Sequence, residues 1–279
     1  MKWNPAAKAA APLLAAAGLT VFALAPAHAT LEQKAPFMDR NYAHRGLHKK
    51  DKSVPENSLA AFRRAVKAGY GVELDVHITA DDQLVVFHDD TLGRMVENAP
   101  EGRIETFTLA ELQALRLAKT DEPIPTLPEV LEILAGRVPL VLEVKAGPKN
   151  RLLCTLTARA LSGYSGPVCI ESFDPFILQW FKKHAPDYLR GQLSQPPKKY
   201  PKGTSEAVRF LAGNLLTNMF ARPHFVSYRI GPKPFTVRLC EAMGAMKAGW
   251  TSHEWTHEKD YDMVIFEHYR PGVWFQAEV

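Results

Sequence analysis

Short apolar runs alternate with amphipathic stretches between residues 40 and 266. Each run spans about four to eight residues, the length of a strand that is buried on both faces, and residues 71–78 and 140–145 are the clearest examples. Between the runs, apolar residues recur at helical spacing, as in residues 58–68, where Asn57 or Ser58 is the expected cap. This alternation predicts about eight strands joined by helices, and therefore a parallel sheet.

The predicted elements fit an eight-stranded (β/α) barrel, whose functional groups stand at the carboxyl ends of the strands. Residues 91–125 interrupt the alternation and are predicted to be irregular apart from a short helix. The expected strands are residues 42–45, 71–78, 84–88, 140–145, 168–173, 189–193, 225–230, 246–251 and 263–266. The expected helices are residues 58–68, 108–117, 126–136, 151–161, 174–184, 205–216 and 235–243.

The first 29 residues have the composition of a targeting segment rather than of a fold. Lys2 and Lys8 make a basic start, residues 9–25 are apolar and rich in alanine, and Ala27-His28-Ala29 is a small-residue cleavage pattern. We predict a signal peptide over residues 1–29 that is cleaved after Ala29. The alternative is an uncleaved N-terminal anchor. Both alternatives predict a domain in the periplasm or outside the cell.

Composition narrows the class of protein. Removing residues 1–29 takes away two lysines and no acidic residue, so the formal charge falls from +4 to +2 over 250 residues. That length fits one large α/β domain, and the even charge balance does not favour nucleic acid as a partner. The three cysteines are interpreted as buried free thiols.

Two carboxylates share one face of a predicted strand. Glu73 and Asp75 are two positions apart, and because side chains alternate along a strand, both point to the same side. Two like charges side by side repel each other and raise each other's pKa. A divalent cation removes that cost, and carboxylate oxygens are the ligands that Mg²⁺ and Ca²⁺ prefer. The pair therefore predicts a site for one divalent cation, Mg²⁺ or Ca²⁺.

The same spacing recurs in residues 140–145, where Glu143 and Lys145 interrupt an apolar run. Glu143 is the third predicted metal ligand. Lys145 and Arg45 would make the mouth of the site cationic enough to hold a phosphodiester, because the guanidinium fork of arginine matches phosphate oxygens. The alternative is a set of salt bridges without metal, but three anions and two cations leave such a network unbalanced.

These motifs resemble, in order and spacing, those of the glycerophosphodiester phosphodiesterase family. The resemblance covers residues 40–272. Its strongest elements are His44-Arg45-Gly46, Pro55-Glu56-Asn57-Ser58, Glu73-Leu74-Asp75, His88-Asp89 and Leu142-Glu143-Val144-Lys145. Weaker echoes are Glu171-Ser172-Phe173, Gly249-Trp250-Thr251 and residues 263–267. The chain departs from the family at residues 250–253, where Trp-Thr-Ser-His replaces the Trp-Thr-Val-Asn of many members.

The resemblance implies a (β/α)8 barrel with an insertion at about residues 89–125, after the second strand. It also implies metal-dependent hydrolysis of glycerophosphodiesters to glycerol 3-phosphate and an alcohol. His44 and His88 would be the general acid and base, and the sequence does not say which is which. Phe173 and Trp250 are candidate walls of the pocket. Five other histidines are interpreted as surface or loop residues without a common site, namely His77, His184, His253, His257 and His268.

Two alternative functions share these residues. A lipid-directed enzyme of the lysophospholipase D type would use the same site with a different mouth, which, like the N-terminal segment, would bring the protein close to a membrane. A barrel that binds a ligand without catalysis is the second alternative, although the complete set of two histidines and three carboxylates argues against it. The sequence does not specify the head group, the oligomeric state, or whether the nucleophile is water or the glycerol hydroxyl.

Overall fold

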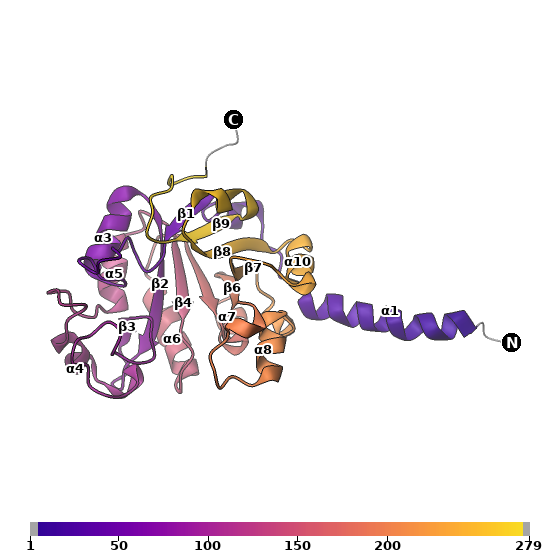
Figure 1. The fold of residues 1–279 in the computed structure, drawn as a ribbon, viewed down its shortest axis with the longest axis horizontal. Coiled ribbons are helices and arrows are strands. Elements are labelled where there is room, and N and C mark those ends of the chain that lie inside the picture. The colour runs from indigo at the N-terminus through magenta and orange to yellow at the C-terminus, as the bar shows by residue number, and fades with distance from the viewer. Residues whose placement is uncertain (1–4, 276–279) are drawn as a thin grey trace.

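Eight parallel strands close into a barrel in the computed structural model, which describes residues 5–275 (Figure 1). The ring closes because β1 pairs with both β2 and β9. The prediction of a (β/α)8 barrel is confirmed. The strands of the ring are β1 (Arg40–Ala43), β2 (Gly71–Ile78), β4 (Leu140–Val144), β5 (Val168–Ser172), β6 (Leu189–Ser194), β7 (Phe225–Arg229), β8 (Met246–Ser252) and β9 (Met263–Phe266).

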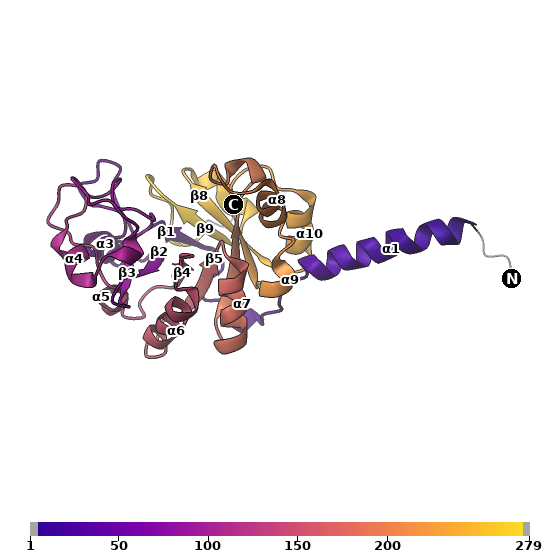
Figure 2. The ribbon, with the colours of Figure 1, turned by 90° about the horizontal axis from the view of Figure 1, so that it is seen from below.

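Helices connect the strands on the outside of the ring (Figure 2). The helix expected over residues 205–216 ends earlier, because α8 (Glu206–Gly213) stops at Gly213, and the short helix α9 (Asn218–Ala221) begins beyond the expected range. A short 3-10 segment, η3 (Trp255–Asp260), connects β8 to β9. The connecting α-helices are α3 (Leu59–Ala68), α5 (Leu127–Leu134), α6 (Asn150–Leu161), α7 (Pro175–His184), α8 (Glu206–Gly213), α9 (Asn218–Ala221) and α10 (Phe235–Ala242).

Several of the connecting helices begin at a residue whose side chain caps them. Ser58, rather than Asn57, caps α3 by accepting a hydrogen bond from the backbone N–H of Ala61. Thr126 forms a capping box with Glu129 at the start of α5, and Asp174 caps α7 before a proline in its first turn. These caps fix where each loop at the carboxyl ends of the strands meets its helix.

The barrel interior is divided into an apolar floor and an acidic layer above it. One hydrophobic cluster fills the floor, and it includes Tyr42, Phe225 and Met263. Phe37, which precedes β1 in the chain, packs in the same cluster. Above this floor, Asp75, Glu143 and Glu171 lie in register on β2, β4 and β5. Alternate residues of β2, such as Leu74, pack outward in the core beneath the helices. Alternation along the strand therefore puts carboxylates inside the barrel and apolar side chains outside it.

An insertion follows the second strand of the ring. It contains β3 (Leu84–Val86), which is antiparallel to β2, the 3-10 turn η1 (Ile104–Thr106) and the helix α4 (Leu109–Ala114). The insertion has a hydrophobic cluster of its own, which includes Phe87 and Leu92. In both ribbon views it lies at the opposite end of the molecule from α1 (Figures 1 and 2).

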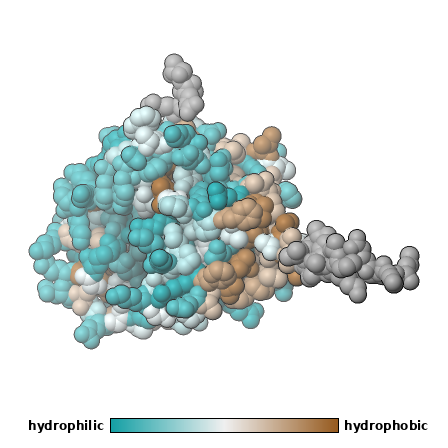
Figure 3. Space-filling model, turned by 45° about the vertical axis from the view of Figure 1, so that its right-hand side comes forward, coloured by the Kyte–Doolittle hydropathy of each residue, from teal (hydrophilic) through white to brown (hydrophobic). Residues whose placement is uncertain are grey.

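The N-terminal helix α1 (Pro5–Leu24) projects away from the barrel. Leu24, at its end, is buried against α9 and α10, and Arg222 donates a hydrogen bond to the carbonyl of Ala25. The short helix α2 (Leu31–Lys34) comes next. Apolar residues gather on the side of the surface from which α1 projects (Figure 3). The exposed large apolar side chains include Phe210 of α8 and Phe235 of α10. Within residues 5–275, none of the helices has the length and hydrophobicity needed to span a membrane.

Candidate active site

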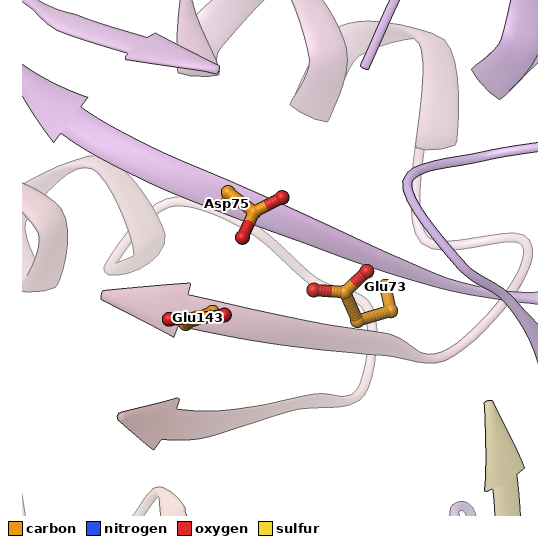
Figure 4. A group of neighbouring side chains, drawn as sticks. All are labelled: Glu73, Asp75 and Glu143. Atoms are coloured by element: carbon orange, nitrogen blue, oxygen red, sulfur yellow. The ribbon is translucent and has the colours of Figure 1, made fainter. Parts of the chain in front are cut away.

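Three carboxylates meet inside the carboxyl end of the barrel. Glu73 and Asp75 come from β2 and Glu143 from the neighbouring β4, and one oxygen of each lies within 4.8 Å of the others (Figure 4). All three side chains are buried. Burial and the neighbouring Asp75 raise the pKa of Glu73 well above its usual range. Carboxylates gathered in this way could hold a metal ion.

Glu171 is a fourth buried carboxylate in this layer, on β5 directly beside Glu143 in the register. Burial, and after it the nearby Glu143, raises the pKa of Glu171 to about 8. Sequence reasoning noted Glu171 only as a weak echo of the family. Its place at the end of a short apolar run, as for Glu143, was the signal that it faces the interior.

Two cations face the carboxylates. Lys145 Nζ lies 2.9 Å from Glu143 Oε1 and 3.4 Å from Asp75 Oδ1, and these two acids raise the lysine pKa although burial opposes them. Arg45 Nε lies 3.6 Å from Asp75 Oδ2. Burial alone would raise the pKa of Asp75, but His88 and the two cations hold it well below its usual range. The predicted phosphate-binding cations are thus in place, already paired with the predicted metal ligands.

The chain turns sharply after β1. Arg45 has φ 52° and Gly46 has φ 78°, and a Cβ on Gly46 would lie 2.9 Å from that of Ala61. The left-handed turn directs the Arg45 backbone N–H to Glu73 Oε2 at 2.9 Å. A non-glycine residue in this conformation stores backbone strain, which persists where the surroundings fix it. The turn thus aims the Arg45 side chain across the mouth of the barrel.

Each predicted catalytic histidine is oriented by a carboxylate. His44 Nδ1 lies 3.0 Å from Glu267 Oε2, and His88 Nδ1 lies 2.6 Å from Asp89 Oδ1. Since a carboxylate only accepts, Nδ1 carries the proton in each pair, and Nε2 is left for chemistry. Burial and Arg45 lower the pKa of His44 to about 4. Asp89 therefore orients the ring of the residue directly before it in the chain.

Glu56 and Arg94 join the first loop to the insertion. Arg94 donates to both oxygens of Glu56, at 2.6 and 2.7 Å, and its Nε lies 2.6 Å from Asp89 Oδ2. Arg45 donates to Glu56 Oε1 at 2.7 Å. Burial opposes the effect, but Arg94 and Arg45 together lower the pKa of Glu56 to about 2. Sequence reasoning missed Arg94, since nothing in the pattern links the two loops.

A cavity of about 590 Å³ opens over these groups and is lined by His44, His88 and the carboxylates Glu73, Glu143 and Glu171. Its apolar side includes both candidate wall residues, Phe173 and Trp250, whose rings pack edge to face at 5.8 Å. All nine predicted site residues lie in or beside this cavity. Asp75 is just below it, where it accepts a hydrogen bond from Asn57 Nδ2.

The interpretation of the other histidines is wrong in two respects. His77 is neither on the surface nor in a loop, because it is buried on β2. His253 and His268 do share a site, since each has Nε2 within 4 Å of Glu267 Oε1, at 3.9 and 3.6 Å. They are distant in the chain from His44 and meet it only because β8, β9 and β1 are neighbours in the barrel.

The sequence model of the Glycerophosphoryl diester phosphodiesterase family matches residues 44–270, which is most of the chain. This protein belongs to that family. The family is one of hydrolases, and its match spans the strands that hold the site, from the residue after β1 to the residues after β9.

Two bacterial relatives match a shorter region. A glycerophosphodiester phosphodiesterase of Caldanaerobacter subterraneus subsp. tengcongensis is 38% identical over 169 residues, and a putative one of Bacillus subtilis, YhdW, is 33% identical over 163 residues. Each match covers 55% of this chain and 65% of the relative. These partial matches do not by themselves establish the activity of the whole protein.

Solved structures share the fold. A phosphodiesterase of Oleispira antarctica, in complex with the product sn-glycerol-3-phosphate, has a TM-score of 0.65 at 24% identity over 82% of this chain and 93% of that one. A glycerophosphodiester phosphodiesterase of Thermotoga maritima has a TM-score of 0.60 at 24% identity over 81% of this chain and 93% of that one. At this level of identity, the likeness concerns the barrel alone.

Proposed function

We propose that this protein is a metal-dependent phosphodiesterase that hydrolyses glycerophosphodiesters to glycerol 3-phosphate and an alcohol. The observation that carries the proposal is the buried group of Glu73, Asp75 and Glu143, which shares one cavity with two carboxylate-oriented histidines. The family assignment and the glycerol 3-phosphate in the Oleispira antarctica structure support this class of substrate.

The three carboxylates fit one divalent cation. They offer oxygen ligands on rigid strands, and the cationic charge within reach, on Lys145 and Arg45, is one short of balancing three anions. Carboxylate oxygens suit both Mg²⁺ and Ca²⁺, so either is proposed. When bound, the cation would polarise a phosphate oxygen and screen its charge.

Arg45 and Lys145 would hold the phosphodiester. Both line the cavity beside the carboxylates, so an incoming phosphate would find two cations that its oxygens can share with Asp75 and Glu143. Charge that develops on the phosphate in the transition state would be stabilised by the same two groups.

His44 and His88 would move the protons. Glu267 and Asp89 fix the two rings through Nδ1, and both rings line the cavity. One Nε2 would take the proton of the nucleophile, which is water or the neighbouring glycerol hydroxyl. The other would give a proton to the leaving alkoxide, a poor leaving group without it.

We also propose that the domain works in the periplasm or outside the cell. The basic start, the apolar residues 9–25 and the pattern Ala27-His28-Ala29 support an exported chain. The mass of the mature protein from its native host decides between cleavage and anchoring. Loss of 29 residues is expected, whereas an intact N-terminus in the membrane fraction would support the anchor.

Release of glycerol 3-phosphate from soluble glycerophosphodiesters, with and without EDTA, tests the proposed function. We expect turnover that EDTA abolishes and that added Mg²⁺ or Ca²⁺ restores. Lysophosphatidylcholine in a parallel reaction tests the lipid-directed alternative, whose product would be lysophosphatidic acid. No turnover of any of these diesters with either metal would favour a barrel that binds without catalysis.

A further inference from the structure

A second chamber lies beside the catalytic cavity. It has a volume of about 690 Å³ and shares the lining residues His44, Arg45 and Trp250 with that cavity, so the two adjoin at the proposed reaction centre. We call it the basic chamber. It is built by loops at the carboxyl ends of β1, β7, β8 and β9, together with Arg94 and Met95 of the insertion.

The basic chamber has a large excess of positive charge. Six lysine or arginine side chains line it, against two carboxylates, Glu56 and Glu267. Those two carboxylates are already engaged, because Glu56 binds Arg45 and Arg94 while Glu267 faces His44 and its neighbours. The six cations are Arg45, Lys49, Lys50, Lys52, Arg94 and Arg229.

Four of these cations have no carboxylate partner. Among the residues described, no carboxylate oxygen lies within 4 Å of the charged group of Lys49, Lys50, Lys52 or Arg229, and Lys52 Nζ donates only to the backbone carbonyl of Arg94, at 3.2 Å. The nearest acid in the first loop, Asp51, instead accepts hydrogen bonds from the backbone and hydroxyl of Ser53. Unpaired cations around a concave surface attract an anion into it.

The catalytic cavity has the opposite character. Five carboxylates line it, and its cations Arg45 and Lys145 are paired. A substrate whose phosphodiester lies at the shared boundary would therefore place one arm in the catalytic cavity, beside carboxylates and apolar side chains, and the other arm in the basic chamber, beside unpaired cations. The carboxylates of the catalytic cavity repel an anionic arm, and the cations of the basic chamber attract it.

We propose that the basic chamber receives the leaving alcohol, and that the preferred substrates carry a phosphate monoester on that alcohol. The proposal rests on the proposed function and gives the head-group class within it. A quaternary ammonium head group is disfavoured for the same reason, since it would enter a chamber of like charge.

A matched pair of substrates isolates the effect. Glycerophosphoglycerol and its terminal phosphate monoester differ by one phosphate, and glycerophosphocholine supplies the cationic comparison. We expect kcat/KM to be at least about tenfold higher for the phosphorylated diester than for the neutral one at low ionic strength, with glycerophosphocholine lowest. Added salt should narrow these differences, because the lysines are exposed.

Charge-removing variants test the location. Changing Lys49, Lys50 and Lys52 to glutamine should lower the ratio of kcat/KM between the phosphorylated and neutral diesters about tenfold, mostly through KM. The matched control changes Lys67, Lys182 and Lys183, which are exposed on the outer helices α3 and α7, to glutamine. It alters net charge equally and should leave the ratio within about twofold of the wild type.

Calorimetric titration of the phosphorylated diester into metal-free protein gives a readout that does not need turnover. The proposal is supported if the phosphorylated diester binds more tightly than the neutral one, and if this difference is lost in the loop variant and kept in the control. Binding of this kind without cleavage of any diester would contradict only the proposed function. Equal binding of both diesters overturns the proposal. The proposal is also overturned if the loop variant keeps the ratio of kcat/KM between the two diesters but no longer binds phosphatidylglycerol vesicles. That result would assign these lysines to a membrane surface.

Discussion

The catalytic cavity and the basic chamber share a boundary but are built from different parts of the fold. The buried carboxylates of the cavity stand on β2, β4 and β5, where strand register and burial fix them. Of the four unpaired cations of the chamber, Lys49, Lys50 and Lys52 stand on a single exposed loop, and Arg229 is the exposed last residue of β7. A rigid scaffold thus holds the groups that must be placed accurately, and loops carry those that select a ligand by charge.

This difference predicts how the two regions respond to mutation. Changes in the strand-held groups should lower turnover of every substrate, because they act on the phosphate and on proton transfer. Changes in the loop-held cations should alter the ranking of substrates and leave the chemistry in place. The following predictions test the distinction.

The largest effects are expected at the two histidines. An alkoxide leaving group needs a proton and a nitrophenolate does not, so the variant without the general acid should lose about a hundredfold or more on glycerophosphodiesters and far less on a nitrophenyl phosphodiester. The variant without the base should lose activity on both. His44→Ala and His88→Ala, assayed on the two substrates, should therefore differ in their activity ratio, which assigns the roles.

Near-normal rates of both histidine variants on glycerophosphodiesters would refute acid–base catalysis by this pair. Complete loss on both substrates in both variants would show that the rings are needed but would contradict the division of labour. His184→Ala, an exposed histidine at the end of α7, is the control and should be fully active.

A smaller but broad effect is expected when one carboxylate is removed from the buried group. Glu143→Gln keeps the shape and loses a charge, so it should need at least about tenfold more Mg²⁺ or Ca²⁺ for activity. Metal should also raise the melting temperature of the wild type, because ligands that bind only the folded state stabilise it. The same rise in the variant should require correspondingly more metal.

Thermal melts over a metal titration provide this measurement without substrate. Glu132→Gln, an exposed residue on the outside of α5, is the matched control and should follow the wild type. If Glu143→Gln and the wild type have the same metal dependence in both melting and activity, Glu143 is not a ligand.

Arg45 lies on the boundary between the two regions, so its substitution should affect all substrates alike. Arg45→Lys keeps the charge but loses the planar fork that reaches Glu56 and Asp75. We expect kcat/KM to fall about tenfold, or about 1.4 kcal/mol, for phosphorylated and neutral diesters equally. Arg63→Lys, exposed on α3, serves as the control. A fully active Arg45→Lys protein would place this arginine away from the phosphate.

Strand periodicity predicted the catalytic cavity because alternation and register are local rules. Residues two positions apart on a buried strand, such as Glu73 and Asp75, had to face the same side, and the apolar runs defined the barrel. Glu171 follows the same rule, but no second charged residue lies two positions away from it, as Lys145 does from Glu143, so the sequence pattern did not single it out.

The basic chamber could not be predicted in this way. Its lysines follow β1, Arg229 ends β7 and His268 follows β9, and what brings them together is the closure of the barrel between β1 and β9. Loop conformation has no periodic signal, and the left-handed turn at Arg45 was not visible in the pattern either. The sequence therefore contained the residues of the proposed chemistry but gave no sign of the surface of the basic chamber.

The smallest effect is expected at Arg94, which contacts both regions. Arg94 lines the basic chamber, yet it is paired with Glu56 and Asp89, and Asp89 orients His88 in the catalytic cavity. Its charge is therefore not available to a head group, and its role should be to position its two partners.

Arg94→Gln should lower kcat about threefold, or about 0.7 kcal/mol, which is the scale of a partly exposed ion pair. The loss should be equal for phosphorylated and neutral diesters, unlike that of the lysine variant. Arg116→Gln is the control, because Arg116 is exposed in the insertion and bonds only to nearby backbone carbonyls. A selective loss on the phosphorylated diester in Arg94→Gln would instead make Arg94 part of the head-group surface, and the boundary between the two regions would lie on the far side of this residue.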